Sequence, residues 1–531
     1  MKDGNRREFR LWTFDFRRST GLRVSTLLAG VVLTVGVCPA PAQTAEDRAA
    51  RYLDSIRAQP SLLLDFLGRM PKGADLHHHL SGAVYAETYI HFAAQDGLCV
   101  DTNTMVLLDP PCDAAKSQQP ASLGLSNQTL WDGMVDAWSM RNFHPNPEDR
   151  SGHDHFFATF GKFGPASDPH TGEMLAEVAS RAASEHELYL ETMFTPDHGA
   201  AAALGKKLGW DDDFGRMRER LLANNLASVV AAGRAALDAA EKQMQQDLHC
   251  QGAQGPSGSQ PDPGCGVTVR YLYQVLRGIP REEVFAQILT GMEMAKADPR
   301  VVGLNLVMPE DGITSMRDFD LHMHMIDFLH GLYPDVAISL HAGELTAGLV
   351  PPDGLRFHIR ESVELGHASR IGHGVDVMYE NDPLGLLREM AGRHVLVEAC
   401  LSSNAVILGV SGDQHPLPVY LRYRVPVALA TDDEGVSRSE LAWEFKRAVE
   451  TYHLSYGEVK KMVRDSLDHA FVAGASLWRA PEEFRPVAAC AGDAPGSLSP
   501  SAGCRRFLSS SAKAKLEWKA EGELRSFESG F

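Results

Sequence analysis

The sequence predicts an α/β fold, a closed (β/α)8 TIM barrel with inserted loops and a C-terminal extension. Three kinds of observation lead to this fold: short apolar runs, helical stretches between them, and polar residues that recur where the runs end. Strands that alternate with helices form a parallel sheet, and about eight such units close into a barrel. An open doubly wound sheet is the alternative, but no GxGxxG motif follows the first expected strand.

The expected strands are apolar runs of the length that buried parallel strands have. They are the run that leads into His77 and residues 188–194, 267–275, 301–308, 336–341, 370–375, 395–401 and 427–431. Stretches with apolar residues at helical spacing precede or separate these runs. We therefore expect helices over residues 45–66, 171–184, 214–244, 281–297, 316–332 and 383–393.

Composition divides the chain into four parts. We expect a signal peptide at residues 1–42, an N-terminal helical segment at 43–69, the barrel domain at 70–480 and a C-terminal extension at 481–531. Residues 97–128 and 245–266 have the composition of loops, so we expect them to be insertions in the barrel.

The first residues have the pattern of an export signal. Several arginines precede the apolar run at residues 27–37, and Ala40-Pro41-Ala42 offers a cleavage site before Gln43. Because the run is too short to span a bilayer comfortably, we expect an exported protein without a stable membrane anchor after cleavage. Its location would be the periplasm or the extracellular space. An arginine pair at residues 6–7 also resembles a twin-arginine signal, so two export routes stay open.

The cysteines agree with an oxidising compartment. Six of them form local pairs around loop-like sequence, namely Cys99 with Cys112, Cys250 with Cys265, and Cys490 with Cys504. Such pairs predict disulfides in an exported protein. Cys400 remains single, within the apolar run at residues 395–400, and we interpret it as structural.

The charge of the chain limits its partners. A net charge of −18 argues against general binding of nucleic acid, which depends on basic side chains that displace counterions. We therefore expect a small-molecule partner. The sequence contains no internal repeat and no heptad array, and no sequence feature indicates an oligomeric state.

Two histidines share one face at the end of the first strand. In the sequence His77-His78-His79, alternate side chains of a strand point the same way, so His77 and His79 can bind one metal ion. Two other His-x-His patterns, at residues 153–155 and 322–324, lie in expected helical or polar segments. Residues two apart diverge on a helix, so we interpret both patterns as structural.

Further polar residues end three later strands. His341 and Glu344 end one strand, His373 lies between two glycines at the end of another, and Asp432 and Asp433 follow the last. The carboxyl ends of barrel strands meet on one face, where catalytic residues lie. Three imidazoles and a carboxylate suit Zn²⁺ and leave a coordination position for water. The strand ends therefore predict a hydrolytic metal site.

The order of these motifs, HxH, HAGE, GHG and TDD, resembles the adenosine deaminase family of the amidohydrolase superfamily. The resemblance covers most of residues 70–470. The export signal and extra cysteines are similar to secreted, growth-factor-like adenosine deaminases, although residues 43–69 are too short for their N-terminal dimerisation domain. The resemblance implies one Zn²⁺ per chain, held by His77, His79, His341 and Asp432.

The resemblance also implies roles for the other residues. Glu344 would be protonated and donate to N1 of the purine, and His373 would take the proton from the zinc-bound water and stabilise the resulting hydroxide. Asp433 would contact N7. Ser81 stands where the family has an aspartate that reaches towards the ribose, followed by Gly82. Met308 is the nearest match to a glycine whose backbone meets the purine.

We therefore expect zinc-dependent hydrolytic deamination of adenosine, or a closely related 6-aminopurine nucleoside, to inosine and ammonia. Adenine, 2′-deoxyadenosine or a modified adenosine are alternatives with the same chemistry, because Ser81, Met193 and Met308 depart from the family pattern. A different class of function is a catalytically silent protein that binds a nucleoside as a signal.

Overall fold

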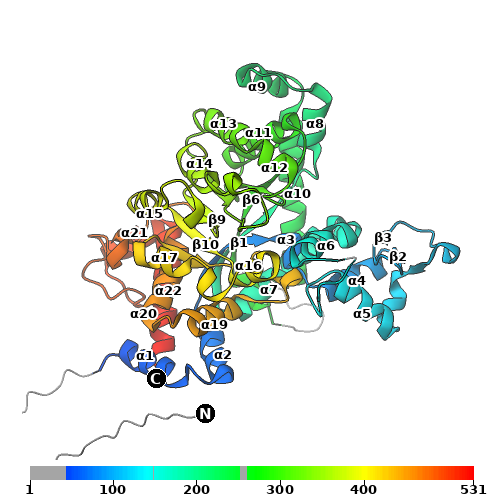
Figure 1. Ribbon diagram of the computed structural model, residues 1–531. Coiled ribbons are helices and arrows are strands. Elements are labelled where there is room, and N and C mark those ends of the chain that lie inside the picture. The colour runs from blue at the N-terminus through cyan, green and yellow to red at the C-terminus, as the bar shows by residue number, and fades with distance from the viewer. Residues whose placement is uncertain (1–42, 148, 251–259) are drawn as a thin grey trace, which may run out of the picture. The chain divides into compact units, whose positions relative to one another are not determined.

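Eight parallel strands form one sheet in the order in which they occur along the chain. Figure 1 shows the chain with its helices and strands labelled. The computed structural model describes residues 43–147, 149–250 and 260–531. The strands are β1 (Gly73–His79), β5 (Glu187–Phe194), β6 (Thr268–Leu276), β7 (Val301–Val307), β8 (Ala337–Ala342), β9 (Arg370–His373), β10 (Leu396–Ala399) and β11 (Val427–Leu429). Every expected strand is present, with bounds that differ by a few residues.

The sheet closes between its first and last strands. A parallel bridge joins His78 to Asp432. The backbone N–H of His79 donates to the carbonyl of Asp432 at 3.0 Å, and the N–H of Asp432 donates to the carbonyl of His77 at 2.8 Å. The Asp75 carboxylate accepts from the backbone N–H of Thr431 at 3.0 Å. The fold is therefore the closed barrel and not the open sheet.

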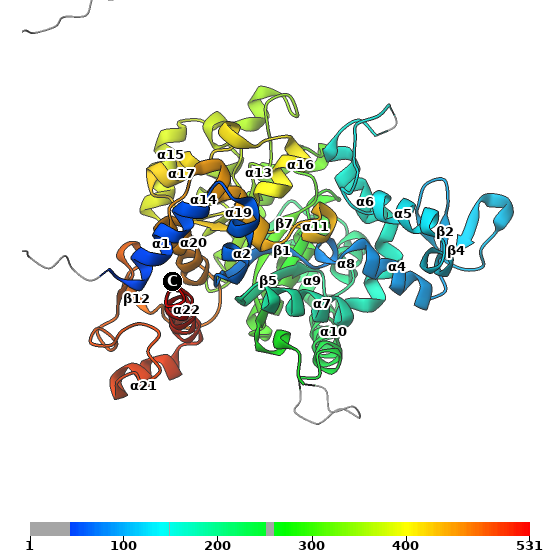
Figure 2. The ribbon, with the colours of Figure 1, turned by 90° about the horizontal axis from the view of Figure 1, so that it is seen from below.

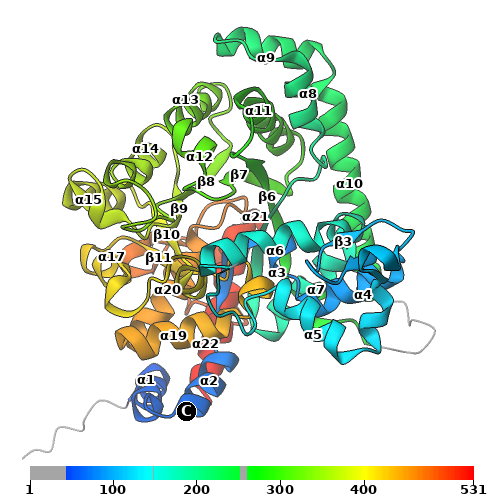
Figure 3. The ribbon, with the colours of Figure 1, turned by 45° about the vertical axis from the view of Figure 1, so that its right-hand side comes forward.

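Helices surround the strands (Figure 3). They include α7 (Thr171–Ser184), α8 (Ala200–Leu208), α11 (Arg281–Ala297), α13 (Phe319–His330), α14 (His358–Glu364), α15 (Pro383–Gly392), α17 (Leu417–Tyr423), α19 (Leu441–Tyr452) and α20 (Tyr456–Asp468). The expected helices at 171–184 and 281–297 have the predicted bounds. None of the described helices is long and apolar enough to cross a membrane.

Three expected helices are each divided in two. Residues 45–66 form α1 (Ala45–Ile56) and α2 (Pro60–Arg69), because Pro60 has no N–H to continue a helix and instead begins a new one. The second pair is α9 (Phe214–Ala223) and α10 (Leu226–Asp247), separated at Asn225, which has a φ of +79°. The third is α12 (Ile313–Arg317) before α13.

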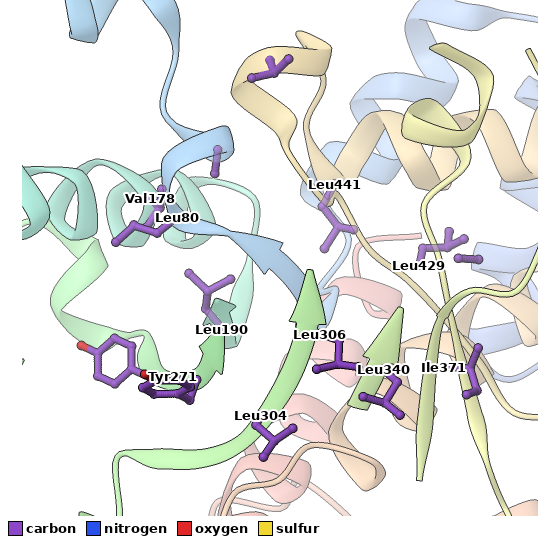
Figure 4. Close-up of a cluster of buried hydrophobic side chains, with 14 of the residues drawn as sticks. Leu80, Val178, Leu190, Tyr271, Leu304, Leu306, Leu340, Ile371, Leu429 and Leu441 are labelled. Carbon is purple, nitrogen blue, oxygen red and sulfur yellow. The ribbon is translucent and has the colours of Figure 1, made fainter. Parts of the chain in front are cut away.

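The main hydrophobic core lies between the strands and the helices. Leu304, Leu306, Leu340, Ile371 and Leu429 are buried on the strands in this core (Figure 4). Burial of each such side chain contributes about 1.5–3 kcal/mol. The alternate residues of the same strands face the barrel interior, where polar side chains reach the site described below.

The segments outside the barrel carry disulfides. In the first insertion, β2 (Cys99–Asp101) pairs with β3 (Leu107–Leu108) and β4 (Gln118–Pro120). This small antiparallel sheet lies between α4 (Ala86–Gln95) and α5 (Gln128–Ala137) in the chain and was not predicted. Disulfides join Cys99 to Cys112, Cys250 to Cys265, and Cys490 to Cys504, which confirms the predicted pairs.

The C-terminal extension packs against the barrel. It contains the short strand β13 (Arg485–Pro486), which pairs with β12 (Trp478–Ala480), and the helices α21 (Ala502–Ser510) and α22 (Ala512–Glu528). Glu521 of α22 forms an ion pair with Arg464 of α20 at 2.6 Å, and the two helices lie together (Figure 2). The expected signal peptide lies outside the described residues, so its prediction stands untested.

Candidate active site

Four side chains from the strand ends point their ligand atoms at one place. They come from β1, from β8 and from the segment that follows β11, and they are His77, His79, His341 and Asp432. Nε2 of His341 lies 3.1 Å from Nε2 of both other histidines. Oδ1 of Asp432 lies 3.5 Å from Nε2 of His77 and 3.3 Å from Nε2 of His79. The structure thus brings together the four predicted metal ligands.

Each of the three histidines is held through its other ring nitrogen. The contacts are His77 Nδ1 to Glu398 Oε2 at 2.7 Å, His341 Nδ1 to Asn305 Oδ1 at 2.8 Å, and His79 Nδ1 to Gln274 Oε1 at 3.2 Å. Because all three partners are oxygen acceptors, each Nδ1 carries a proton. Outer hydrogen bonds of this kind are typical of metal-ligating histidines. The donor set and its supports therefore fit a divalent ion such as Zn²⁺.

Sequence reasoning missed these three supporting residues. Glu398 could have been recognised from the sequence, because it is a charged residue within the apolar run of β10 and a buried charge requires a polar or charged partner. It also pairs with Arg370 at 2.6 Å. Asn305 is likewise a polar residue within the apolar strand β7, but an uncharged side chain is a weaker indication of a functional partner.

The histidines differ in their affinity for protons. Burial lowers the pKa of His79 to about 4, so its imidazole is neutral at pH 7. Burial also lowers the pKa of His341 well below its ordinary value. For His77, burial is outweighed by hydrogen bonds to Asp432 and Glu398, which raise the pKa to about 10. A cation bound between these rings would displace the proton on His77, so metal binding here releases a proton.

Two further carboxyl groups at the site favour their protonated forms. Burial, and then the charge of Asp432, raise the pKa values of Glu344 and Asp433 well above the ordinary range. Both residues line the same cavity. A buried carboxylic acid that stays protonated at neutral pH can donate a hydrogen bond or a proton to a ligand.

Two glycines leave the space that the site residues occupy. A Cβ atom on Gly82 would lie 1.5 Å from Oδ1 of Asp433, and one on Gly372 would lie 2.4 Å from Cε1 of His77. Neither position accepts a larger residue without a shift of the side chain beside it. Gly82, a predicted binding residue, therefore gives Asp433 its place.

Three non-glycine residues at the strand ends have a left-handed backbone. The φ angles are +86° for Met308, +67° for His373 and +64° for Asp432. Such conformations are costly for residues with a Cβ atom and gather at functional sites. The sequence placed Met308 where the family has a glycine, and its backbone has the conformation that a glycine adopts easily.

A cavity of about 450 Å³ opens above the ligand cluster. Its polar floor consists of His79, Gln274, His341, Glu344, Asp432 and Asp433. Its apolar wall consists of Phe156, Phe157 and Phe160 of α6 (Gly152–Ser167), Ile407 of α16 (Leu401–Leu408), Leu276, Val307, Met308 and Pro309. Ser81 completes the lining. Among the described residues that line it, none is a lysine or an arginine.

A buried ion network holds the loop that carries Glu344. The Glu310 carboxylate accepts from the backbone N–H groups of Gly343 at 2.9 Å and Glu344 at 2.7 Å, and it pairs with His358. Arg277 donates to the carbonyl of His341 at 3.1 Å. Burial opposes the ionised form of Glu310, but the His358 charge and hydrogen bond outweigh it and lower its pKa to about 2.

The other histidine patterns stay outside the ligand cluster, as predicted. His78 turns away and contacts Thr192 through Nδ1 at 2.9 Å. His153 pairs with Asp311 at 2.9 Å, and His155 contacts the carbonyl of Ser139 at 3.0 Å. On α13, His322 is buried while the side chain of His324 is half exposed, so the two diverge.

Cys400 lies closer to the site than the sequence indicated. Its Sγ atom is within 4.8 Å of ligand atoms of His77, His373 and Asp432. Burial raises the pKa of the thiol well above its ordinary value, so it is protonated and a poor ligand or nucleophile. Its buried position agrees with the structural interpretation.

Comparison with known proteins connects the site to a family. The adenosine deaminase family model matches residues 173–476, more than half of the chain. An adenosine deaminase of Enterococcus faecalis is 27% identical over 227 residues, 37% of this chain and 63% of the relative. An adenine deaminase of Rhizobium leguminosarum is 31% identical over 139 residues, 26% of this chain and 39% of the relative. The chain thus spans less than two thirds of the length of these curated relatives.

Among solved structures, the apo N6-methyl-AMP deaminase of Arabidopsis thaliana has a TM-score of 0.50 at 19% sequence identity. The match covers 80% of this chain and 97% of that protein, and it shows the same barrel fold. The residues matched by the family model include His341, Glu344, His373 and Asp432. The chain therefore belongs to the adenosine deaminase family.

Proposed function

We propose that this protein is a metal-dependent hydrolase that deaminates adenosine, or a close 6-aminopurine nucleoside, to the 6-oxo purine and ammonia. One observation carries the proposal: three imidazole Nε2 atoms and one carboxylate converge beside a buried, protonated Glu344 on the floor of a cavity. Family membership supports the same reaction class.

The residues of the floor have complementary tasks in this proposal. His77, His79, His341 and Asp432 would hold a divalent ion, which would lower the pKa of a water to near 7 and so supply a nucleophile. Glu344, held protonated by burial, donates to N1 of the purine and makes C6 more electrophilic. Asp433, also protonated, donates to N7 and fixes the orientation of the ring. The apolar wall on α6 covers the ring and excludes bulk water.

The lining of the cavity favours an unphosphorylated substrate. Arg and Lys are the side chains that usually bind phosphate, and the described lining offers neither. A nucleoside is therefore favoured over a nucleotide, although one structural relative acts on N6-methyl-AMP. Adenine is a second candidate, since another relative is an adenine deaminase.

A panel assay tests the proposal. Formation of the 6-oxo purine by zinc-loaded protein is measured with adenosine, 2′-deoxyadenosine, adenine, N6-methyladenosine and AMP; the released amine is ammonia, or methylamine from N6-methyladenosine. We expect turnover of at least one unphosphorylated compound, none of AMP, and a large loss in Glu344→Gln, which keeps the shape but cannot supply an acidic proton. Tight nucleoside binding without turnover of any compound would instead favour the silent binding protein.

We also propose that the protein is exported. Its three disulfides support this, because disulfides persist in oxidising compartments. Cell fractionation with N-terminal sequencing tests the proposal, and we expect a mature chain that begins near Gln43 in the periplasm or the medium. Cytosolic full-length protein would contradict it.

A further inference from the structure

A second and larger cavity lies where the C-terminal extension meets the barrel. It is a groove of about 1180 Å³ between α22, the loop at residues 496–499 and the start of β6. No residue that lines it also lines the cavity above the ligand cluster. Strand β6 contributes Thr268 and Arg270, at its amino-terminal end, whereas the candidate active site lies at the carboxyl ends of the strands. The groove is therefore separate from that site.

The groove is basic, although the chain as a whole is acidic. Among the described residues that line it, the cations are Arg270, Lys515, Lys519 and Arg525, and the one carboxylate is that of Glu523. Glu523 compensates little of this charge, because its Oε1 lies 3.9 Å from Nζ of Lys519 in an exposed pair. A chain with a net charge of −18 therefore presents a local surface of the opposite sign.

Two of these cations, Arg270 and Lys515, have no carboxylate partner among the residues that the structure describes. The guanidinium of Arg270 is half-buried and donates to the carbonyl of Val269, its neighbour in β6, at 2.7 Å. A guanidinium has five N–H groups, so most of them remain available to a ligand. Arg525, in contrast, donates to the carbonyl of Pro495 at 3.2 Å. A partly buried cation without a counter-ion favours an anion in the groove.

The loop that forms one wall of the groove is fixed in place. It lies between Cys490 and Cys504, which are joined by a disulfide. The indole N–H of Trp518 on α22 donates to the carbonyl of Ser497 at 3.1 Å. A Cβ atom on Gly496 would lie 2.1 Å from a backbone nitrogen of α22, so the loop and the helix are in close contact. The groove is therefore preformed, and a ligand does not have to order it.

The lining also indicates the chemistry of the ligand. Lys515 and Arg525 lie about 15 Å apart along α22, so one small anion cannot reach both. The apolar residues Val472, Leu498 and Leu516 line the same groove, and Leu498 is fully exposed. A ligand that matches this lining is extended and carries both negative charges and apolar groups. An acidic peptide has these properties, whereas polyphosphate has no apolar groups and a flat membrane surface does not enter a groove.

We infer that this groove binds an acidic peptide segment of a partner protein. Carboxylates of the segment pair with Arg270, Lys515 and Lys519, and its apolar side chains contact Leu498 and Leu516. Salt weakens this binding, because two of the three cations are exposed on the surface of α22. The C-terminal extension thus has a binding role that does not depend on the proposed deaminase reaction.

Fluorescence anisotropy of a labelled synthetic peptide tests the inference on the protein with its disulfides intact. The probe is an extended peptide of about ten residues, built from glutamate, leucine and serine, which is long enough to cover the groove. We expect saturable binding that weakens with salt, and much weaker binding of the same peptide with glutamine in place of glutamate. Absence of binding, or equal binding of the glutamine peptide, would overturn the inference. The measurement needs no turnover, so it is independent of the deaminase assay.

Two variants and two competitors locate the binding and identify its chemistry. Replacement of both Lys515 and Lys519 by glutamine should raise the Kd of the peptide about two- to fivefold for each cation lost, and these exposed side chains are not needed for folding. Lys116→Gln, at an exposed lysine of the first insertion, is the matched control and should leave the Kd unchanged. Wild-type affinity in the double variant would refute the site. Tighter binding of polyphosphate, or of phosphatidylglycerol vesicles, to the same lysines would refute the peptide as the ligand.

Discussion

Replacement of Glu310 by glutamine should destabilise the protein by about 3 kcal/mol at pH 7. The Glu310 carboxylate accepts from two backbone N–H groups, of Gly343 and Glu344, and pairs with His358. The figure rests on the shift of the Glu310 pKa from its ordinary value of 4.5 to about 2, which corresponds to that free-energy difference. Loss of one partner of a buried ion pair gives a similar cost of about 3–5 kcal/mol.

The same pKa fixes the pH dependence of this cost. Because the folded-state pKa of Glu310 is lowered, its stabilisation is complete above about pH 4.5 and is lost as the pH falls towards 2. By pH 3 the difference between wild type and Glu310→Gln should be less than half of its value at pH 7. Urea unfolding followed by tryptophan fluorescence at several pH values measures it.

A matched control separates this ion pair from general acid effects. Glu364 forms an exposed i,i+4 pair with Arg360 at 2.9 Å, so Glu364→Gln should cost less than about 0.5 kcal/mol at any pH. If Glu310→Gln is as stable as the wild type, or if its deficit grows as the pH falls, the assigned role of the network is wrong.

Three further predictions concern the site and the disulfides. Glu398→Gln should weaken zinc binding about 10- to 100-fold, because the amide is a poorer support for His77, and competition with a chelator measures this. Gly82→Ala should abolish most activity while zinc content stays near one per chain, because the added Cβ displaces Asp433; normal turnover in this variant would contradict the assigned packing. Cys490→Ser should lower stability by about 2–4 kcal/mol, as read from thermal unfolding, and reductant should add nothing further at that bond.

The barrel was predictable because its strands are apolar runs separated by helical stretches, and four of these runs lead into polar residues. The small sheet within residues 97–128 could not be predicted, because β2, β3 and β4 are only two or three residues long. Strands of this length are too short to show a hydrophobic period. Helix interruptions at Pro60 and Asn225 were also missed. Pro60 is a visible helix-start signal, whereas the left-handed backbone of Asn225 depends on the surrounding packing.

The candidate ligands were predictable for a topological reason. Strand ends in a barrel meet on one face, so residues far apart in the chain, such as His77 and Asp432, could be placed together. The network that holds the Glu344 loop could not be placed in this way. Glu310 lies in the loop after β7, and its contacts with Gly343, Glu344 and His358 depend on side-chain directions that strand order does not determine.

The seam that closes the barrel has a consequence for the metal-free protein. Strand β1 and the segment after β11 are joined by backbone hydrogen bonds at His77, His79 and Asp432, which are also three of the four candidate ligands. An ion bound by ligands from both segments would stabilise their contact. Its removal should therefore let the two segments separate before the rest of the barrel unfolds. Hydrogen exchange at the amides of His79 and Asp432 should therefore accelerate on chelation well before the amides of β7 respond.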